Sequence, residues 1–145
     1  MSEKKSLESE IEDAERLHGH LGPFLVIGVR MGRTAKQVLD VDLGGNDELR
    51  AFVSVPLSTP FSCVIDGIQV ATRCTIGNQK LKVENSKEEI VARFERKNPS
   101  RVLRIRLNPG VAGTIVDRMS QGSSVEELAR EVMRLSEGTL FSMEM

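Results

Sequence analysis

The segment Leu17-His18-Gly19-His20-Leu21-Gly22-Pro23 lies between two predicted helices and contains both histidines of the chain. Gly19 can take the left-handed conformation that ends a helix, and Pro23 suits the first position of the next one. Before the segment, apolar residues recur at spacings of four and three, which predicts an amphipathic helix: Leu7, Ile11, Ala14 and Leu17. The two imidazoles are therefore expected at a helix junction, where a capping or turn role competes with a ligand role.

The helix that follows Pro23 has an apolar arc wider than one face, so we expect it to be the central helix, buried on two sides. Gly28 and Gly32 on this helix would let another backbone approach closely, although chance spacing explains them equally well. A third helix is predicted from Phe61 to about Arg73, because Thr59-Pro60 is a helix-start signal.

Alternating apolar and polar residues predict strands near 49–57, 81–83, 90–95 and 103–107. The last two are joined by the short polar turn Asn98-Pro99-Ser100, which favours an antiparallel hairpin. Its outward face carries Arg93, Arg104 and Arg106, for which solvation is favoured over an anionic ligand.

Turn and cap signals complete the secondary-structure prediction. Asp42–Asp47 is a loop by composition, Asn108-Pro109 opens a helix, and a capping box at Ser123 or Ser124 opens the last one, which ends by Gly138. The tail from Phe141 to Met145 is too short for an assignment. Residues 1–145 are thus predicted to form a single α+β domain, an antiparallel sheet of about four to five strands packed against helices.

The composition excludes several classes of function. The chain has 145 residues, a formal net charge of −1, and five Phe with no Trp or Tyr, so it lacks both the positive field and the stacking platforms of a nucleic-acid reader. Its polar, charged beginning is unlike a secretory signal, and no apolar run approaches the length of a membrane span. We therefore expect a cytoplasmic protein with no nucleic-acid or membrane partner and with reduced thiols.

The two cysteines are predicted to lie apart. Cys63 and Cys74 are eleven residues apart, which is roughly 16 Å along an unbroken helix, so they would neither form a disulfide nor share one ion. Cys63 falls in the first turn, where the helix dipole favours a thiolate, and Asp66 shares its face. For Cys74, a small buried apolar residue is the favoured interpretation.

Scarce donor residues suggest a metal site. Imidazole and thiolate suit zinc, iron, nickel or copper, and His18, His20 and Cys63 would supply three donors. Asp66, water or a substrate would complete the coordination, as in a catalytic rather than a structural site. The spacing alone is a weak signal, because His-x-His is common.

Two motifs resemble the FmdE family of formylmethanofuran dehydrogenase proteins. These are His18-Gly19-His20 with the flanking Gly22-Pro23, and Cys63-x-x-Asp66-Gly67-Ile68-Gln69-x-x-Thr72-x-Cys74-Thr75-x-Gly77. The resemblance covers roughly residues 10 to 107. It implies an α+β core, often dimeric, with a metal, commonly zinc, bound near the motif residues. When the family's motif positions are matched to this sequence, the metal candidates are His18, His20, Cys63 and Cys74, and the cofactor-binding candidates are Asp66 and Gln69.

Three positions depart from that family's pattern. Gly22 stands in place of a cysteine, which removes a ligand; Arg73 replaces a glycine, and Asn78 replaces a lysine. The chain also lacks the cysteines of the family's zinc-finger extension.

The resemblance therefore implies a metal- or small-molecule-binding protein, often a homodimer, linked to one-carbon formyl metabolism. It does not assign a reaction. Two alternatives stay open: a metal-free scaffold or interaction protein that keeps the fold, and a thiol redox protein that uses Cys63.

Overall fold

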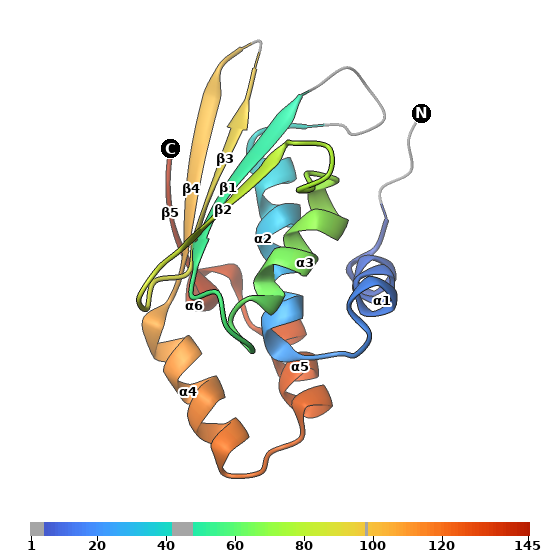
Figure 1. Cartoon of the computed structure of the whole chain (residues 1–145), viewed down its shortest axis with the longest axis vertical. Coiled ribbons are helices and arrows are strands. Elements are labelled where there is room, and N and C mark those ends of the chain that lie inside the picture. Colours follow the sequence, from blue (N-terminus) through green and yellow to red (C-terminus); the bar gives the residue numbers. More distant parts are fainter. Residues whose placement is uncertain (1–4, 42–47, 98) are drawn as a thin grey trace.

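A computed structural model describes residues 5–41, 48–97 and 99–145, and within them it confirms an α+β fold (Figure 1). The predicted loop at 42–47 and Asn98 of the predicted hairpin turn lie outside this part. The helices are α1 Leu7–His18, α2 Pro23–Val38, α3 Cys63–Thr72, α4 Pro109–Ser120, α5 Val125–Arg134 and α6 Glu137–Leu140. The strands are β1 Leu49–Val55, β2 Leu81–Asn85, β3 Val91–Arg96, β4 Arg101–Leu107 and β5 Phe141–Glu144.

The strands form one mixed sheet in the order β2-β1-β3-β4-β5. The predicted hairpin is confirmed: β3 and β4 are antiparallel, with Phe94 opposite Leu103. Of these strands, only β2 is parallel to its neighbour, β1, because α3 forms the crossover between them and returns the chain to the same end of the sheet. The predominantly antiparallel sheet agrees with the sequence prediction.

The C-terminal tail adds an edge strand that the sequence did not reveal. Ser136 caps the short helix α6 by accepting a hydrogen bond from the Thr139 amide, and the chain then runs along β4 with Phe141 opposite Leu107. Of the four residues in β5, only Phe141 is buried. So short a segment has no periodicity to read, and its structure comes from pairing with β4.

Helix α2 is the central helix, as predicted, and it crosses α3 at two glycines (Figure 1). A Cβ added at Gly28 would lie 2.1 Å from the carbonyl oxygen of Val64, and one added at Gly67 would lie 2.3 Å from that of Leu25. Real Cβ atoms do not approach other atoms so closely, so only glycine permits this crossing. The close approach that the spacing of Gly28 and Gly32 suggested is therefore present.

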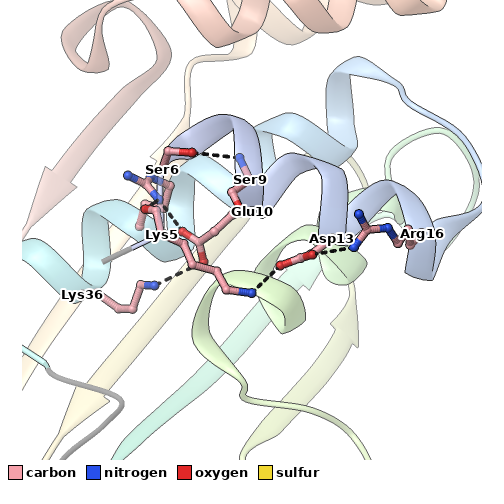
Figure 2. A network of polar contacts seen from close by, with 8 residues as sticks. Lys5, Ser6, Ser9, Glu10, Asp13, Arg16 and Lys36 are labelled. Atoms are coloured by element: carbon pink, nitrogen blue, oxygen red, sulfur yellow. Dashed lines mark hydrogen bonds and ion pairs between the residues drawn. The ribbon is translucent and has the colours of Figure 1, made fainter. Parts of the chain in front are cut away.

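A buried carboxylate ties α1 to α2 (Figure 2). The side chain of Glu10 is only 5% exposed, and its two oxygens pair with Arg33 and with Lys36, the latter at 3.3 Å. On the solvent side of α1, Asp13 pairs with Lys5 at 2.6 Å and with Arg16 at 3.1 Å. Burial is the main cause that lowers the pKa of Lys36, and Glu10 opposes it.

The sheet face opposite α2 and α3 carries the arginines of the hairpin. Arg93, Arg104 and Arg106 are exposed, as predicted. The Arg93 guanidinium lies 4.3 Å from the centroid of the Phe52 ring, and Arg106 pairs with Glu89 at 3.0 Å. Among the described residues, no helix has both the length and the apolar character that crossing a bilayer requires.

Candidate functional site

The two histidines lie at the junction of α1 and α2. His18 is the last residue of α1; Gly19 follows in the left-handed conformation, with φ of 103°, and its amide donates to the carbonyl of Glu15 at 2.7 Å. The rings of His18 and His20 then approach each other, with centroids 4.6 Å apart and planes tilted by 42°. The helix stop predicted at Gly19 is what brings the two imidazoles together.

Helix α3 supplies a carboxylate to His18. The Nδ1 atom of His18 lies 2.7 Å from Oδ2 of Asp66, across 48 positions of sequence. The other ring nitrogen, Nε2, is buried and has no hydrogen-bond partner among the residues that the structure describes. A histidine held by a carboxylate through one nitrogen, with the other free, is the usual arrangement of a metal-binding or acid–base imidazole.

Asp66 is itself held by Gln69, one turn further along α3. The side-chain amide of Gln69 donates from Nε2 to Oδ1 of Asp66 at 3.3 Å, and its Oε1 accepts from the backbone N–H of Ile76 at 3.3 Å. Both predicted cofactor-binding residues, Asp66 and Gln69, thus have partners within the protein.

Cys63 begins α3, one turn before Asp66, and is buried, with 8% of its surface exposed. Burial raises the pKa of its thiol, and the neighbouring Asp66 carboxylate raises it further. The direction is opposite to the lowering expected from the helix dipole. Desolvation and a like charge on the same face outweigh the partial charge of the helix terminus.

Cys74 is not brought to this cluster. It follows the C-terminal end of α3, whereas Cys63 is at the other end, and both thiols are free. The Cys74 sulfur donates to the carbonyl oxygen of Leu49 at 3.1 Å, and burial raises the pKa of this thiol. These contacts agree with the interpretation of Cys74 as a small buried residue.

The donors do not form a complete cage. In the part of the chain that the structure describes, no three His, Cys, Asp or Glu side chains are grouped closely enough to hold a metal ion. Two surface hollows, of about 360 Å³ beside α4 and α5 and about 590 Å³ on the outer sheet face, are lined by neither histidine. What indicates a site is therefore the buried, unpartnered nitrogen of His18.

Residues 17–142 match the sequence model of the FmdE family, described as molybdenum formylmethanofuran dehydrogenase operon. The chain belongs to the FmdE family. A stretch of 72 residues is also 38% identical to a protein of Archaeoglobus fulgidus named "Probable S-adenosyl-L-methionine-binding protein". That stretch covers 47% of this chain but only 18% of the Archaeoglobus protein, so the match spans less than a fifth of the relative's length.

The FmdE departure at Gly22 falls beside the histidines. Gly22 has an extended backbone, with φ of −147°, and a Cβ added there would lie 3.9 Å from both Cδ2 and Nε2 of His20. A side chain at this position would therefore approach the imidazole without a clash. The Cβ of a cysteine would therefore be accommodated at this position, next to the His20 ring.

Two residues near the site were not predicted from the sequence. Glu126 is the second residue of α5; a backbone hydrogen bond and the Ser124 hydroxyl lower its pKa most, and the charges of Arg130 and His20 contribute less. Asn78 organises the turn that presents the Ile76 amide to Gln69. In the sequence, Glu126 was visible only as part of a capping box with Ser123, and Asn78 only as a departure from the motif.

Proposed function

We propose that this FmdE-family chain is a binding protein whose ligand presents a metal ion or a hydrogen-bond donor to Nε2 of His18. The observation that carries the proposal is the buried, unpartnered Nε2 of an imidazole whose Nδ1 contacts Asp66. A buried acceptor without a donor costs free energy, so a ligand that supplies the missing partner would recover it. The role is accessory to one-carbon formyl metabolism, following the description of the family.

Zinc is the first ligand to test. His18 and His20 would supply imidazole nitrogens, and Cys63, one turn from Asp66, would supply sulfur after losing its proton. Asp66 and Gln69 would orient His18 and not contact the ion, and Cys74 would not take part. Because no three donors are preassembled among the described residues, binding would include side-chain rearrangement, and the affinity is expected to be modest.

The experiment is calorimetric titration of the purified, metal-free chain with Zn²⁺, repeated with His18→Ala, His20→Ala and Cys63→Ser. One ion per chain is expected for the wild type, with a large loss of affinity in each variant. Cys74→Ser is the matched control, because Cys74 is also a free, buried cysteine and lies outside the proposed site. Unchanged binding in His18→Ala, or no binding to the wild type, would refute the zinc site.

S-adenosylmethionine is a second ligand for the same titration, because a relative sharing 38% identity over 72 residues carries that name. Its sulfonium and amino groups are cationic, and an amino group can donate to an imidazole nitrogen. Binding that His18→Ala removes would support this ligand in place of zinc.

The surroundings of Cys63 disfavour the thiol redox alternative. Catalytic thiols are recognised by a lowered pKa, whereas burial and Asp66 raise that of Cys63. A scaffold role is distinguished by the titrations above, in which such a protein binds neither ligand. Two free cysteines fit the reducing environment of the cytoplasm, where we propose that the protein acts.

We also propose that the chain forms a homodimer, as the family resemblance implies, and that α4 provides the interface. Only Ile115 of this helix is buried, and the apolar residues Ala112, Val116 and Met119 remain partly exposed along it. Sedimentation should give twice the chain mass of 16.0 kDa. Val116→Asp should yield a monomer, and Val102→Asp, on the outer sheet face, should not; the reverse pattern would move the interface to the sheet.

A further inference from the structure

The contacts around Gln69 have a fixed direction. A backbone N–H can only donate, so the Ile76 amide determines which end of the Gln69 side chain is oxygen. The NH₂ group must then face Asp66, whose carboxylate accepts it through Oδ1. The other oxygen, Oδ2, is left to accept from His18 at 2.7 Å.

We infer that Gln69 and Asn78 are positioning residues that hold the proton of neutral His18 on Nδ1 and leave the lone pair on Nε2. Ile76 donates to Gln69 and Gln69 donates to Asp66, so Gln69 fixes the orientation of the carboxylate, which accepts from His18 through its other oxygen. Reversing the His18 tautomer would place two acceptors, Nδ1 and Oδ2, against each other. This tautomer is the one that the proposed function requires, because it leaves Nε2 of His18 able to accept a ligand. The tautomer can be measured without any ligand.

The Ile76 amide is held in place by Asn78. The Oδ1 atom of Asn78 accepts from the amides of Thr75 and Lys80, each at 3.0 Å, and its Nδ2 donates to the carbonyl of Arg73 at 2.7 Å. The amide of Asn78 in turn donates to the Thr75 hydroxyl at 3.0 Å. Four hydrogen bonds of one residue thus shape the turn from α3 to β2.

The contacts link three segments: the turn at 73–80, helix α3 and the end of α1, where His18 lies. Gln69 is only partly buried and does not belong to the apolar core, so its loss should not unfold the protein. What its loss should change is how firmly Asp66 presents Oδ2 to His18, and with it the balance of the two neutral tautomers of His18.

The test is nitrogen NMR of the two imidazoles in the metal-free full chain. His18 and His20 are the only histidines, so two pairs of ring-nitrogen signals are expected, and His18→Ala assigns them. The wild type should carry the His18 proton on Nδ1. Gln69→Leu, which keeps the size of the side chain and removes both hydrogen bonds, should lower the Nδ1–H to Nε2–H ratio about threefold to tenfold. Asn78→Ala should shift it in the same direction.

Gln37→Leu is the matched control, an exposed glutamine on α2, and it should leave the ratio unchanged. Circular dichroism checks that each variant folds. A wild-type proton on Nε2, or a ratio that Gln69→Leu leaves unaltered, would overturn the inference, as would an equal shift in Gln37→Leu. Because no metal is added, these results are independent of whether zinc binds in the separate titration.

Discussion

Adding one methyl group at Gly28 should separate the two helices that assemble the site. The Cβ of Gly28→Ala would lie 2.1 Å from the Val64 oxygen, 2.9 Å from the Val64 carbonyl carbon and 3.1 Å from Cα of Gly67. Ordinary contacts begin near 3.4 Å, so the backbone of α3 would have to retreat by about 1 Å or more. Both helices are regular and their backbones cannot move aside as a flexible side chain would.

The magnitude follows from two opposing effects. Overpacking of a closely packed core costs about 1–3 kcal/mol, and a clash with backbone belongs at the upper end of that range. Alanine is favoured over glycine in a helix by about 1 kcal/mol, which offsets part of the loss. We expect Gly28→Ala to lower the free energy of unfolding by about 2 kcal/mol.

Gly113 offers the matched control, since it lies inside α4 and a Cβ there would meet nothing within 4 Å. Gly113→Ala should therefore raise the free energy of unfolding by about 0.5–1 kcal/mol. Urea unfolding of both variants measures the difference, and His18 NMR follows the 2.7 Å contact with Asp66. If both substitutions changed stability with the same sign and size, the argument from the helix crossing would be wrong.

Three further predictions concern the charge network, the thiols and position 22. Glu10→Gln should lower the free energy of unfolding by about 2–3 kcal/mol, somewhat below the cost of breaking a fully buried pair because its cationic partners are partly exposed. Asp13→Asn should lower it much less in the same urea assay, because that ion pair is exposed to solvent. Burial raises the pKa of both thiols, so the stability that their protonated forms contribute is present below the unfolded pKa of about 8.5. The free energy of unfolding should fall as pH rises above that value. The double variant Cys63→Ala/Cys74→Ala should flatten this alkaline decline, and an unchanged slope would contradict the prediction. Gly22→Cys should increase zinc affinity about tenfold or more while Gly22→Ser should not, and equal affinities in the titration would show that position 22 lies outside the coordination sphere.

The sequence predicted the parts of the fold that local physics controls. Apolar periodicity located the main helices, and the signals at Gly19, Pro23 and Ser124 agree with the observed caps; Ser124, not Ser123, accepts from the Glu127 amide. The alternating pattern identified the β3–β4 hairpin. It missed β5, whose four residues have only one buried side chain and depend on β4 for their structure.

For the site, residue rarity and motif resemblance pointed to two segments that the fold places in contact at His18 and Asp66, but not to how their side chains interact. The contact between His18 and Asp66 was not predictable, because it joins two helices whose separation depends on the glycine crossing. The thiol of Cys63 was misjudged for a related reason. Helix position was visible in the sequence, whereas burial, which reverses the expected pKa shift, was not.

What the sequence determined by itself was the family, the class of fold and those helix ends that Gly19 and Pro23 mark, since these depend on residue types at short spacings. The end predicted at Gly138 was wrong: α5 ends at Arg134, and Gly138 lies inside the short helix α6, which Ser136 caps. The tertiary structure alone decided that Asp66 and Gln69 orient His18, that Cys74 packs against the Leu49 carbonyl away from them, and that one imidazole nitrogen stays buried without a partner among the described residues. Those outcomes depend on distances between segments dozens of residues apart, which are set by how closely α2 and α3 can pack.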